Sequence, residues 1–178
     1  MRSKGVENEE SEDFATFYER SRDDCLRTVY AAVGDASHAE DLIAEAFAKA
    51  YANWRKVRLH PAPRAWVVRV ALNTHVSWWR RRRREVAWDT SDEAFDPAAE
   101  THGSELPDRQ VMGALRMLPR RQREVVALRI FLDLDTETTA RALGISPGTV
   151  KAHLARASTT LRETLAPTDT LSEETVSP

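Results

Sequence analysis

The sequence predicts an all-α fold with two small helical domains joined by an acidic linker. Apolar residues recur at steps of three and four over residues 14–84 and again over 108–165, which is the period of amphipathic helices. No stretch alternates apolar and polar residues as a half-buried strand does. Between these segments, residues 85–107 are acidic, have little apolar periodicity and contain Pro97 and Gly103, so we interpret them as a linker.

The first domain, residues 13–84, begins with a helix that starts near Phe14. Residues 1–12 precede it as an acidic lead that we expect to be flexible. Gly34 is expected to end this helix, and either Asp35 or Ser37 then caps the next one.

The second helix has one apolar side and one charged side. Asp41 and Glu45 lie one turn apart on the charged side, together with Lys49. Paired carboxylates can serve acid–base chemistry, but neither a histidine nor a metal-ligand set joins them here. We therefore interpret them as a solvent-facing or partner-facing edge, and we find no residue constellation for catalysis or metal binding. The expected apolar side is formed by Leu42, Ile43, Ala46, Phe47, Ala50, Tyr51 and Trp54.

A loop is expected over residues 55–63, because Pro61 and Pro63 exclude regular helix there. Pro63 also suits the first turn of a third helix that runs to about Arg84.

The end of this third helix combines aromatic rings with cations, since Trp78 and Trp79 precede the five arginines of 80–84. This combination suits single-stranded or melted nucleic acid, because bases stack on the rings while cations follow the phosphates. Periodicity assigns Trp78 to the core and leaves Trp79 as the exposed candidate. We expect His75 to be a surface residue of the helix.

The formal net charge of −2 hides a strongly segregated charge pattern. Residues 55–84 carry ten basic and no acidic side chains, whereas residues 85–108 carry eight acidic and no basic ones. Residues 109–162 are basic again, with ten Lys and Arg against four Asp and Glu. Two basic blocks can each neutralise several phosphates, so the pattern favours a nucleic-acid partner despite the small total.

Cys25 is the only cysteine, which excludes an intrachain disulfide framework and a cysteine-based zinc site. No apolar run reaches the roughly 18–20 residues of a membrane span, and the N-terminus lacks the apolar core of a signal peptide. We therefore expect a cytoplasmic protein without a membrane span.

The second domain, residues 108–166, is expected to contain four short helices, and residues 167–178 are expected to be a disordered tail. The helices are predicted from an Asp108 cap to Leu118, from Pro119 to about Phe131, from an Asp135 cap to Leu143, and from a Ser146 cap to Leu165.

The last two of these helices have the spacing of a helix-turn-helix. Gly144 supplies the left-handed position after the first, Ile145 fills the corner, and Ser146 with Pro147 begins the second. Small and basic residues then occupy the face that would enter a DNA major groove, as base edges and phosphates require. An ordinary helical hairpin with a charged solvent face is the alternative. The predicted DNA-facing residues are Thr149, Lys151, Ala152, His153 and Arg156, with Arg120, Arg121 and Arg123 as candidate contacts to the backbone.

Four motifs resemble those of group 4, or extracytoplasmic function (ECF), sigma factors of bacterial RNA polymerase. Residues 38–47 resemble sigma region 2.2, and residues 63–73 with the arginine run resemble regions 2.3–2.4. Residues 118–125 and 143–151 resemble region 4. The four motifs occur in the family's order.

The resemblance implies a role for each domain. The first domain would dock on the β′ clamp helices of core RNA polymerase through Asp41, Glu45 and Lys49. The loop of residues 55–62 would hold a flipped base of the melted −10 element. The second domain would read the double-stranded −35 element and sit on the β flap, while the acidic linker would thread toward the RNA exit channel.

The residues assigned by this resemblance form two sets, and no cofactor or metal is implied. The −10 set comprises Arg55, Lys56, Arg58, His60, Arg69, Asn73, Trp79, Arg80, Arg81 and Arg83. The −35 set comprises Arg120, Arg123, Thr149, Lys151, Ala152, His153 and Arg156.

The predicted function is that of a non-enzymatic promoter-specificity subunit that assists promoter melting. The alternative is a stand-alone helix-turn-helix regulator whose first domain senses a signal or dimerises. Such a regulator needs neither the Trp/Arg helix nor the acidic linker. Regulation of a sigma subunit is expected to come from a separate anti-sigma factor or from transcriptional control.

Overall fold

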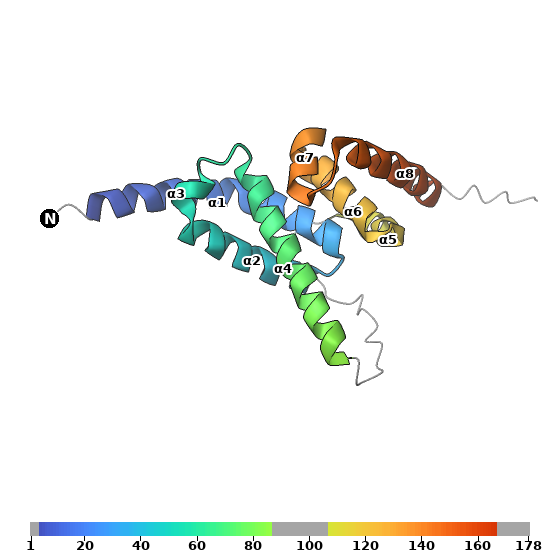
Figure 1. Cartoon of the computed structure of the whole chain (residues 1–178), viewed down its shortest axis with the longest axis horizontal. Helices are drawn as coiled ribbons and strands as arrows, with labels where there is room; N and C mark the ends of the chain where they lie inside the picture. The colour runs from blue at the N-terminus through green and yellow to red at the C-terminus, as the bar shows by residue number, and fades with distance from the viewer. Residues whose placement is uncertain (1–3, 87–106, 167–178) are drawn as a thin grey trace, which may run out of the picture.

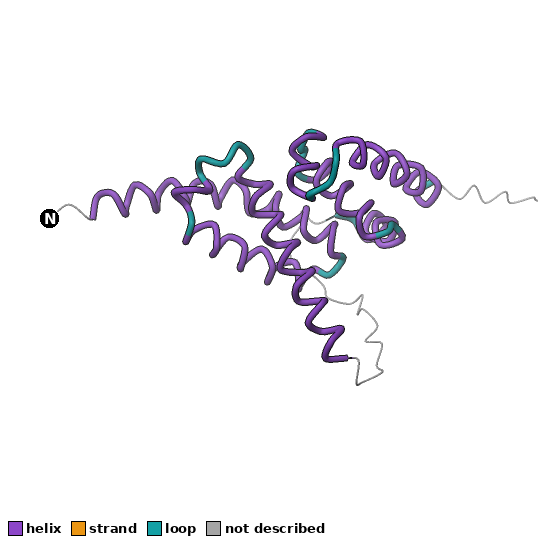
Figure 2. Tube along the Cα trace, in the orientation of Figure 1, coloured by secondary structure: helices purple, strands orange, loops and turns teal. Residues whose placement is uncertain are grey.

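The computed structural model describes residues 4–86 and 107–166, and within these ranges it contains helices and turns but no strand (Figures 1 and 2). The first domain contains α1 (Lys4–Val33), α2 (Ala36–Ala52), α3 (Trp54–Val57) and α4 (Pro63–Val86). The second contains α5 (Arg109–Met117), α6 (Arg120–Val126), the wide turn η1 (Ala127–Phe131), α7 (Thr136–Leu143) and α8 (Pro147–Leu165). The predicted all-α class is confirmed.

Helix α1 is longer than predicted, because residues 4–12, expected to be a flexible lead, are helical. Glutamate is a good helix former and no proline interrupts this segment, so the helix that includes Phe14 extends toward the N-terminus. Its predicted end is confirmed, since Gly34 has a φ of +90° and its N–H donates to the Tyr30 carbonyl at 2.7 Å.

Helix α2 is capped by Asp35, one of the two predicted caps, whose carboxylate accepts from the His38 N–H at 2.8 Å. Most of the predicted apolar side is buried, including Leu42, Ile43 and Phe47. Tyr51 is the exception, with 56% of its surface exposed.

The segment predicted as a loop over 55–63 begins with the short helix α3. Pro61 and Pro63 restrict only the residues next to them, so a helical turn can form before them. Burial of Trp54 and Val57 on the first domain anchors this turn. Helix α4 starts at Pro63, as predicted, and ends two residues beyond the predicted Arg84.

The helix predicted from Pro119 to Phe131 is α6 followed by the π-helical turn η1. The predicted caps of α7 and α8 are confirmed: Asp135 accepts from the Thr138 N–H at 2.7 Å, and Ser146 accepts from the Thr149 N–H at 3.1 Å. Asp108 precedes α5, as predicted, but its side chain makes no capping hydrogen bond.

The two domains pack against each other across α1. Helix α1 contacts α2 and α4 on the side of its own domain, and it also contacts α5, α6 and η1 of the second domain. One cluster of buried apolar residues accordingly contains members from both domains, such as Val29 and Leu128. The C-terminal part of α4 projects away from this packed body (Figure 1).

No helix in the described part of the chain is both long and apolar enough to cross a membrane.

Candidate nucleic-acid and polymerase interfaces

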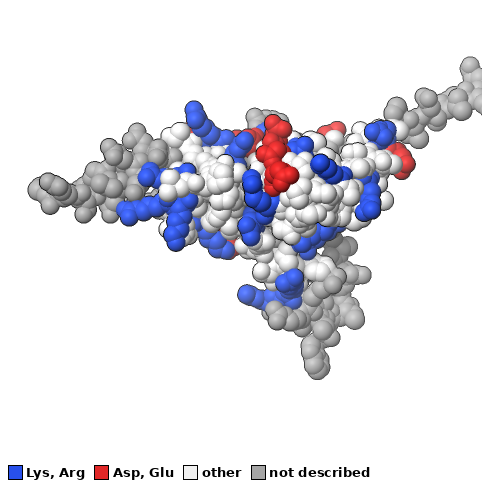
Figure 3. All heavy atoms as spheres, turned by 45° about the horizontal axis from the view of Figure 1, so that its top comes forward, with Lys and Arg blue, Asp and Glu red and all other residues white. Residues whose placement is uncertain are grey.

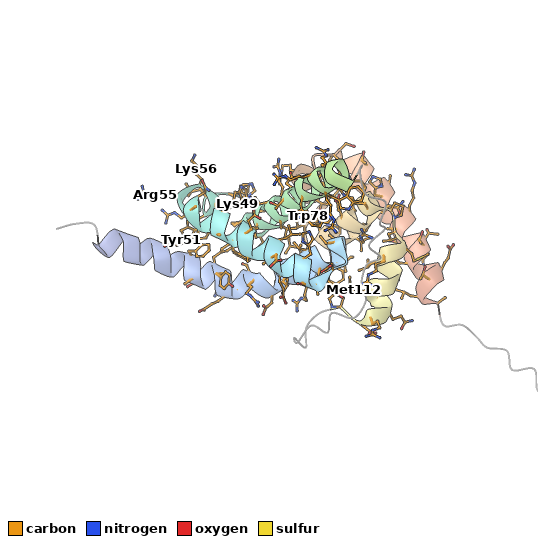
Figure 4. All side chains as sticks on the ribbon, turned by 90° about the horizontal axis from the view of Figure 1, so that it is seen from below. Lys49, Tyr51, Arg55, Lys56, Trp78 and Met112 are labelled. Atoms are coloured by element: carbon orange, nitrogen blue, oxygen red, sulfur yellow. The ribbon has the colours of Figure 1, made fainter. Side chains whose placement is uncertain are left out.

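The −10 residues of the predicted loop lie at one end of the first domain. Arg55 and Lys56 are exposed on α3 and point away from the body of the molecule (Figure 4). Arg58 and His60 follow in the turn before α4, and both are exposed. The His60 Nδ1 atom accepts from the Ala62 N–H at 3.0 Å, which fixes the ring against its own turn.

Three −10 residues of α4 share one exposed face, and this face borders the second domain. Arg69, Asn73 and Arg80 line a cleft of about 310 Å³, and Arg120 and Arg121 of α6 line its other side. Arg81 is also exposed on α4, whereas the side chain of Arg83 lies outside the described part of the chain.

The assignment of Trp78 to the core is wrong. Trp78 is 43% exposed and Trp79 is 44% exposed, so both indoles lie at the surface of α4. Trp78 contacts the His38 ring at 4.9 Å between centroids, and the Arg82 guanidinium lies 5.1 Å from the Trp78 ring. Two adjacent indoles thus lie partly exposed next to the arginine run.

His75 forms a pair with His38 instead of facing solvent as predicted. The His38 Nε2 and His75 Nδ1 atoms are 3.0 Å apart, and both residues are half-buried. Burial, together with the charges of His38, Arg120 and Arg123, lowers the pKa of His75 to about 4. His75 is therefore neutral near pH 7.

The predicted polymerase contacts share one exposed surface of α2. Asp41, Glu45 and Lys49 are all exposed, and the Lys49 ammonium pairs with the Glu45 carboxylate one turn away. The Lys49 Nζ atom also lies 3.4 Å from the Thr74 hydroxyl of α4. The surface is hydrophilic and of mixed charge, which suits contact with a partner protein more than catalysis.

The helix-turn-helix forms α7 and α8, with Gly144 in the left-handed conformation at a φ of +65°. Thr139 of α7 is fully buried, and its hydroxyl donates to the Asp135 carbonyl at 2.8 Å. On the buried side of α8, Val150 and Ala157 have no exposed surface. The two helices are therefore held together by packing, in a buried cluster that includes Ala140 of α7 and Val150 of α8.

The predicted groove-facing residues of α8 differ in exposure. Lys151, Ala152 and Arg156 are exposed. Thr149 is half-buried next to the Ser146 hydroxyl, and its own hydroxyl lies 2.8 Å from that oxygen. His153 is half-buried, and its Nδ1 atom is buried with no hydrogen-bond partner within the described residues.

The arginines at the start of α6 have partners within the protein. Arg120 and Arg121 both donate to the buried carboxylate of Glu124, at 2.7 and 2.9 Å. The Arg123 Nε atom donates to the Ala32 carbonyl of α1 at 2.7 Å. Arg123, which was predicted to contact a DNA phosphate, therefore binds the first domain in this arrangement.

Sequence patterns did not indicate the residues that join the two domains. Arg116 of α5 donates from its guanidinium to the Gly34 carbonyl at 2.8 Å. The contact links residues 82 positions apart. In the sequence, Arg116 has the pattern of any arginine on the polar side of an amphipathic helix. No local signal distinguishes it.

Basic side chains are spread over both domains on the face seen in Figure 3, while acidic side chains appear in few places. The "Sigma-70 region 2" family model matches residues 17–85, and the "Sigma-70, region 4" model matches residues 108–161. Each domain thus carries the sequence pattern of one sigma region. The chain belongs to the sigma-70 family.

Relatives of this sigma factor match most of its length. The RNA polymerase sigma-E factor of Streptomyces coelicolor is 40% identical over 85% of this chain and 86% of its own. The RNA polymerase sigma-E factor of Streptomyces avermitilis is 38% identical over 85% of each chain. The sigma factor SigV of Bacillus subtilis is 26% identical over 83% of this chain and 88% of its own.

A solved structure has a similar fold across both domains. It is the sigma factor RpoE of Bartonella quintana in complex with the anti-sigma factor NepR, with a TM-score of 0.74 and 27% identity. The match covers 86% of this chain and 97% of that sigma chain.

These findings identify the protein as an ECF sigma factor, a promoter-specific subunit of RNA polymerase. The stand-alone regulator is not favoured, because the relatives that match both domains are sigma factors. Within the described residues no cluster of three or more potential metal ligands occurs.

Proposed function

We propose that this sigma subunit reads the −35 element with α8 and the −10 element with α3, α4 and the turn between them. The observation that carries the proposal is the exposure of cations on these elements, outside the packed core. On α8, Lys151 and Arg156 flank the small residue Ala152, which permits close approach to a major groove.

The −10 element would be bound in melted form by the first domain. Arg55, Lys56 and Arg58 provide cations around the turn, and the two exposed indoles of α4 provide surfaces for base stacking. Extruding a base costs a few kcal/mol, so the turn must offer it favourable contacts. Exposed arginines on α4, such as Arg69 and Arg81, would follow the phosphates.

Core polymerase would be bound through the exposed surface of α2 that carries Asp41, Glu45 and Lys49, which would meet the β′ clamp helices. The second domain would contact the β flap. The acidic segment 85–107 lies almost wholly outside the described residues. It would follow a basic channel of polymerase toward the RNA exit.

The subunit would act without catalytic groups of its own and in the cytoplasm, where promoter DNA and core polymerase meet. An anti-sigma factor is a candidate regulator, since the similar Bartonella sigma factor was solved with one.

The test is transcription in vitro with purified core polymerase and a promoter mapped from the start sites of this sigma factor. Lys151→Ala and Arg156→Ala should each reduce promoter-specific transcription about tenfold, which is what one lost base or phosphate contact costs. Arg162→Ala is the matched control, because Arg162 is exposed on the last turn of the same helix. Core association should be unchanged in all three variants. A loss of core association in Lys151→Ala, or equal transcription by all variants, would contradict the assignment.

A further inference from the structure

A cleft and a cavity lie side by side where α4 of the first domain meets the second domain. Arg69 of α4 and Ala142 of α7 line both of them, so the cleft and the cavity meet at these two residues. The cleft has a volume of about 310 Å³ and the cavity about 410 Å³. Both volumes fall within the range of about 300–1,000 Å³ that is typical of small-molecule sites, which often lie between domains.

The cleft concentrates positive charge. Its lining contains four arginines, and Glu124 is the one acidic residue among the described residues that line it. Arg120 and Arg121 already share the carboxylate of Glu124. Guanidinium groups bind phosphate through paired N–H donors, so several of them in one cleft suit a ligand with more than one phosphate. The four arginines are Arg69 and Arg80 of α4 and Arg120 and Arg121 of α6.

Arg69 is the cation that the cleft and the cavity share. Its side chain is exposed, and it forms neither a hydrogen bond nor an ion pair with another residue in the described part of the chain. A guanidinium has five N–H donors and no acceptor, so it binds anions. Arg69 is therefore placed to bind a phosphate at the point where the cleft and the cavity meet.

The cavity differs from the cleft because its lining is largely apolar. Trp66 contributes an aromatic indole that is half-buried. Such a ring suits the base of a nucleotide, because bases of every kind stack on aromatic side chains. Small apolar residues complete this part of the lining, namely Pro61, Ala62, Ala65 and Ala142.

Polar groups on two walls of the cavity can hydrogen-bond a base or a sugar. The His60 Nδ1 atom accepts from the Ala62 N–H at 3.0 Å, so in the neutral ring the Nε2 atom carries the proton and can donate it. On the opposite wall, Arg141 of α7 donates to the Thr138 hydroxyl at 3.0 Å and has further N–H donors. These donors would bind the heteroatoms of a base or the hydroxyl groups of a ribose.

We propose that the cleft and the cavity together form a binding site for a nucleotide with two or more phosphates. The base would stack on Trp66 in the cavity, and the phosphates would lie among the arginines of the cleft. A DNA strand brings one phosphate per nucleotide, so four arginines in one cleft exceed what a single flipped nucleotide requires. The site does not depend on the proposed promoter contacts, although it shares Arg69, Arg80 and Arg120 with them.

A nucleotide at this site would contact both domains at once, because α4 lines one wall and α6 and α7 line the other. A ligand stabilises the arrangement of the protein that it binds. The nucleotide would also hold Arg69, which the −10 element requires, so promoter binding would respond to the concentration of a small molecule. This effect rests on the proposed role of Arg69 at the promoter, whereas nucleotide binding itself does not.

Nucleotide binding is tested by isothermal titration calorimetry of the full-length chain with GDP. One GDP should bind per chain, about tenfold or more tightly than guanosine, which lacks the phosphates, and than pyrophosphate, which lacks the base. Equal affinity for pyrophosphate would indicate a site for simple anions, and equal affinity for guanosine would exclude a role for the arginines. Either result, or no binding at millimolar GDP, would overturn the proposal.

The location of the site is tested with single arginine variants. Arg69→Ala and Arg141→Ala each remove one cation from one wall, and each should weaken GDP binding about tenfold. Arg109→Ala is the matched control, because Arg109 is exposed on α5 and lines neither the cleft nor the cavity. All three side chains are exposed, so the helical circular dichroism should stay the same. Full GDP affinity in Arg69→Ala or Arg141→Ala, or an equal loss in Arg109→Ala, would overturn this location.

Competition with the promoter is tested on the complex with core polymerase, using a labelled promoter duplex. GDP should weaken promoter binding by the complex with the unaltered chain but not by the complex with Arg141→Ala, since Arg141 lines the cavity and belongs to neither promoter set. The same response in both complexes, or none in either, would overturn the competition. If the GDP titration fails while Lys151→Ala still reduces transcription, the nucleotide site is wrong and the promoter contacts stand.

Discussion

Truncation of Leu128 to alanine tests whether the two domains share one core. Leu128 lies on η1 in the second domain, has no exposed surface, and belongs to the cluster that includes residues of α1 and α2. Leu→Ala changes at such sites cost about 2–5 kcal/mol, because transfer free energy is lost and a cavity remains. Ile130→Ala is the matched control two residues along the same turn, where the side chain is 65% exposed and the cost should be below about 0.5 kcal/mol.

The five tryptophans separate the contributions of the two domains in a urea titration. All of them, Trp54, Trp66, Trp78, Trp79 and Trp88, precede the second domain in the sequence. Intrinsic fluorescence therefore follows the first domain, while circular dichroism follows helices of both. If the domains share a core, Leu128→Ala should lower the urea midpoint of both signals.

Two results would refute this reasoning. If the circular dichroism midpoint falls while the fluorescence midpoint stays, then the domains unfold independently. If neither midpoint changes, then Leu128 is not buried as the structure describes. A shift in Ile130→Ala equal to that in Leu128→Ala would also contradict the burial argument.

Three further predictions follow from single side chains. Because the folded chain lowers the pKa of His75 to about 4 from an ordinary value near 6.5, the stability that depends on its neutral form is complete above pH 6.5 and declines as the pH falls toward 4. The urea midpoint of His75→Gln should therefore fall less between pH 7 and pH 5 than that of the unaltered chain. An equal fall in both would contradict the role of His75. Burial raises the pKa of the Cys25 thiol to about 12, so iodoacetamide should label it slowly at pH 8 and rapidly in urea; equal rates would contradict this. Asp41→Arg should weaken binding to core polymerase about tenfold in a pull-down, whereas Glu163→Arg on α8 should not, and equal binding would remove Asp41 from the proposed surface.

Features of this molecule that depend on neighbouring residues were predictable from the sequence. Gly34 and Gly144 both take the left-handed conformation that their positions after a helix require. Asp35 and Ser146 cap the helices that follow them, because a short polar side chain next to a free N–H needs no distant partner. The two helical domains and the helix-turn-helix follow from such signals combined with apolar periodicity.

Features that depend on which surface packs against another were not predictable. Periodicity placed Trp78 in the core, but its ring lies at the edge of α2 against His38, and the indole is 43% exposed. Arg123 has the sequence context of a phosphate contact, yet it donates to a carbonyl of α1. The same side chain can satisfy either role, and only the position of the second domain decides between them.

The sequence by itself determined the all-α class, the domain order, and the separation of charge into basic, acidic and basic segments. Helix period, caps and charge are properties of residues close together in the chain, so they appear without a three-dimensional structure. The tertiary structure decided that the second domain packs on α1 and α4, because this contact joins residues such as Gly34 and Arg116 across 82 positions. Contacts over that separation depend on complementary surfaces, which exist only after both domains have folded.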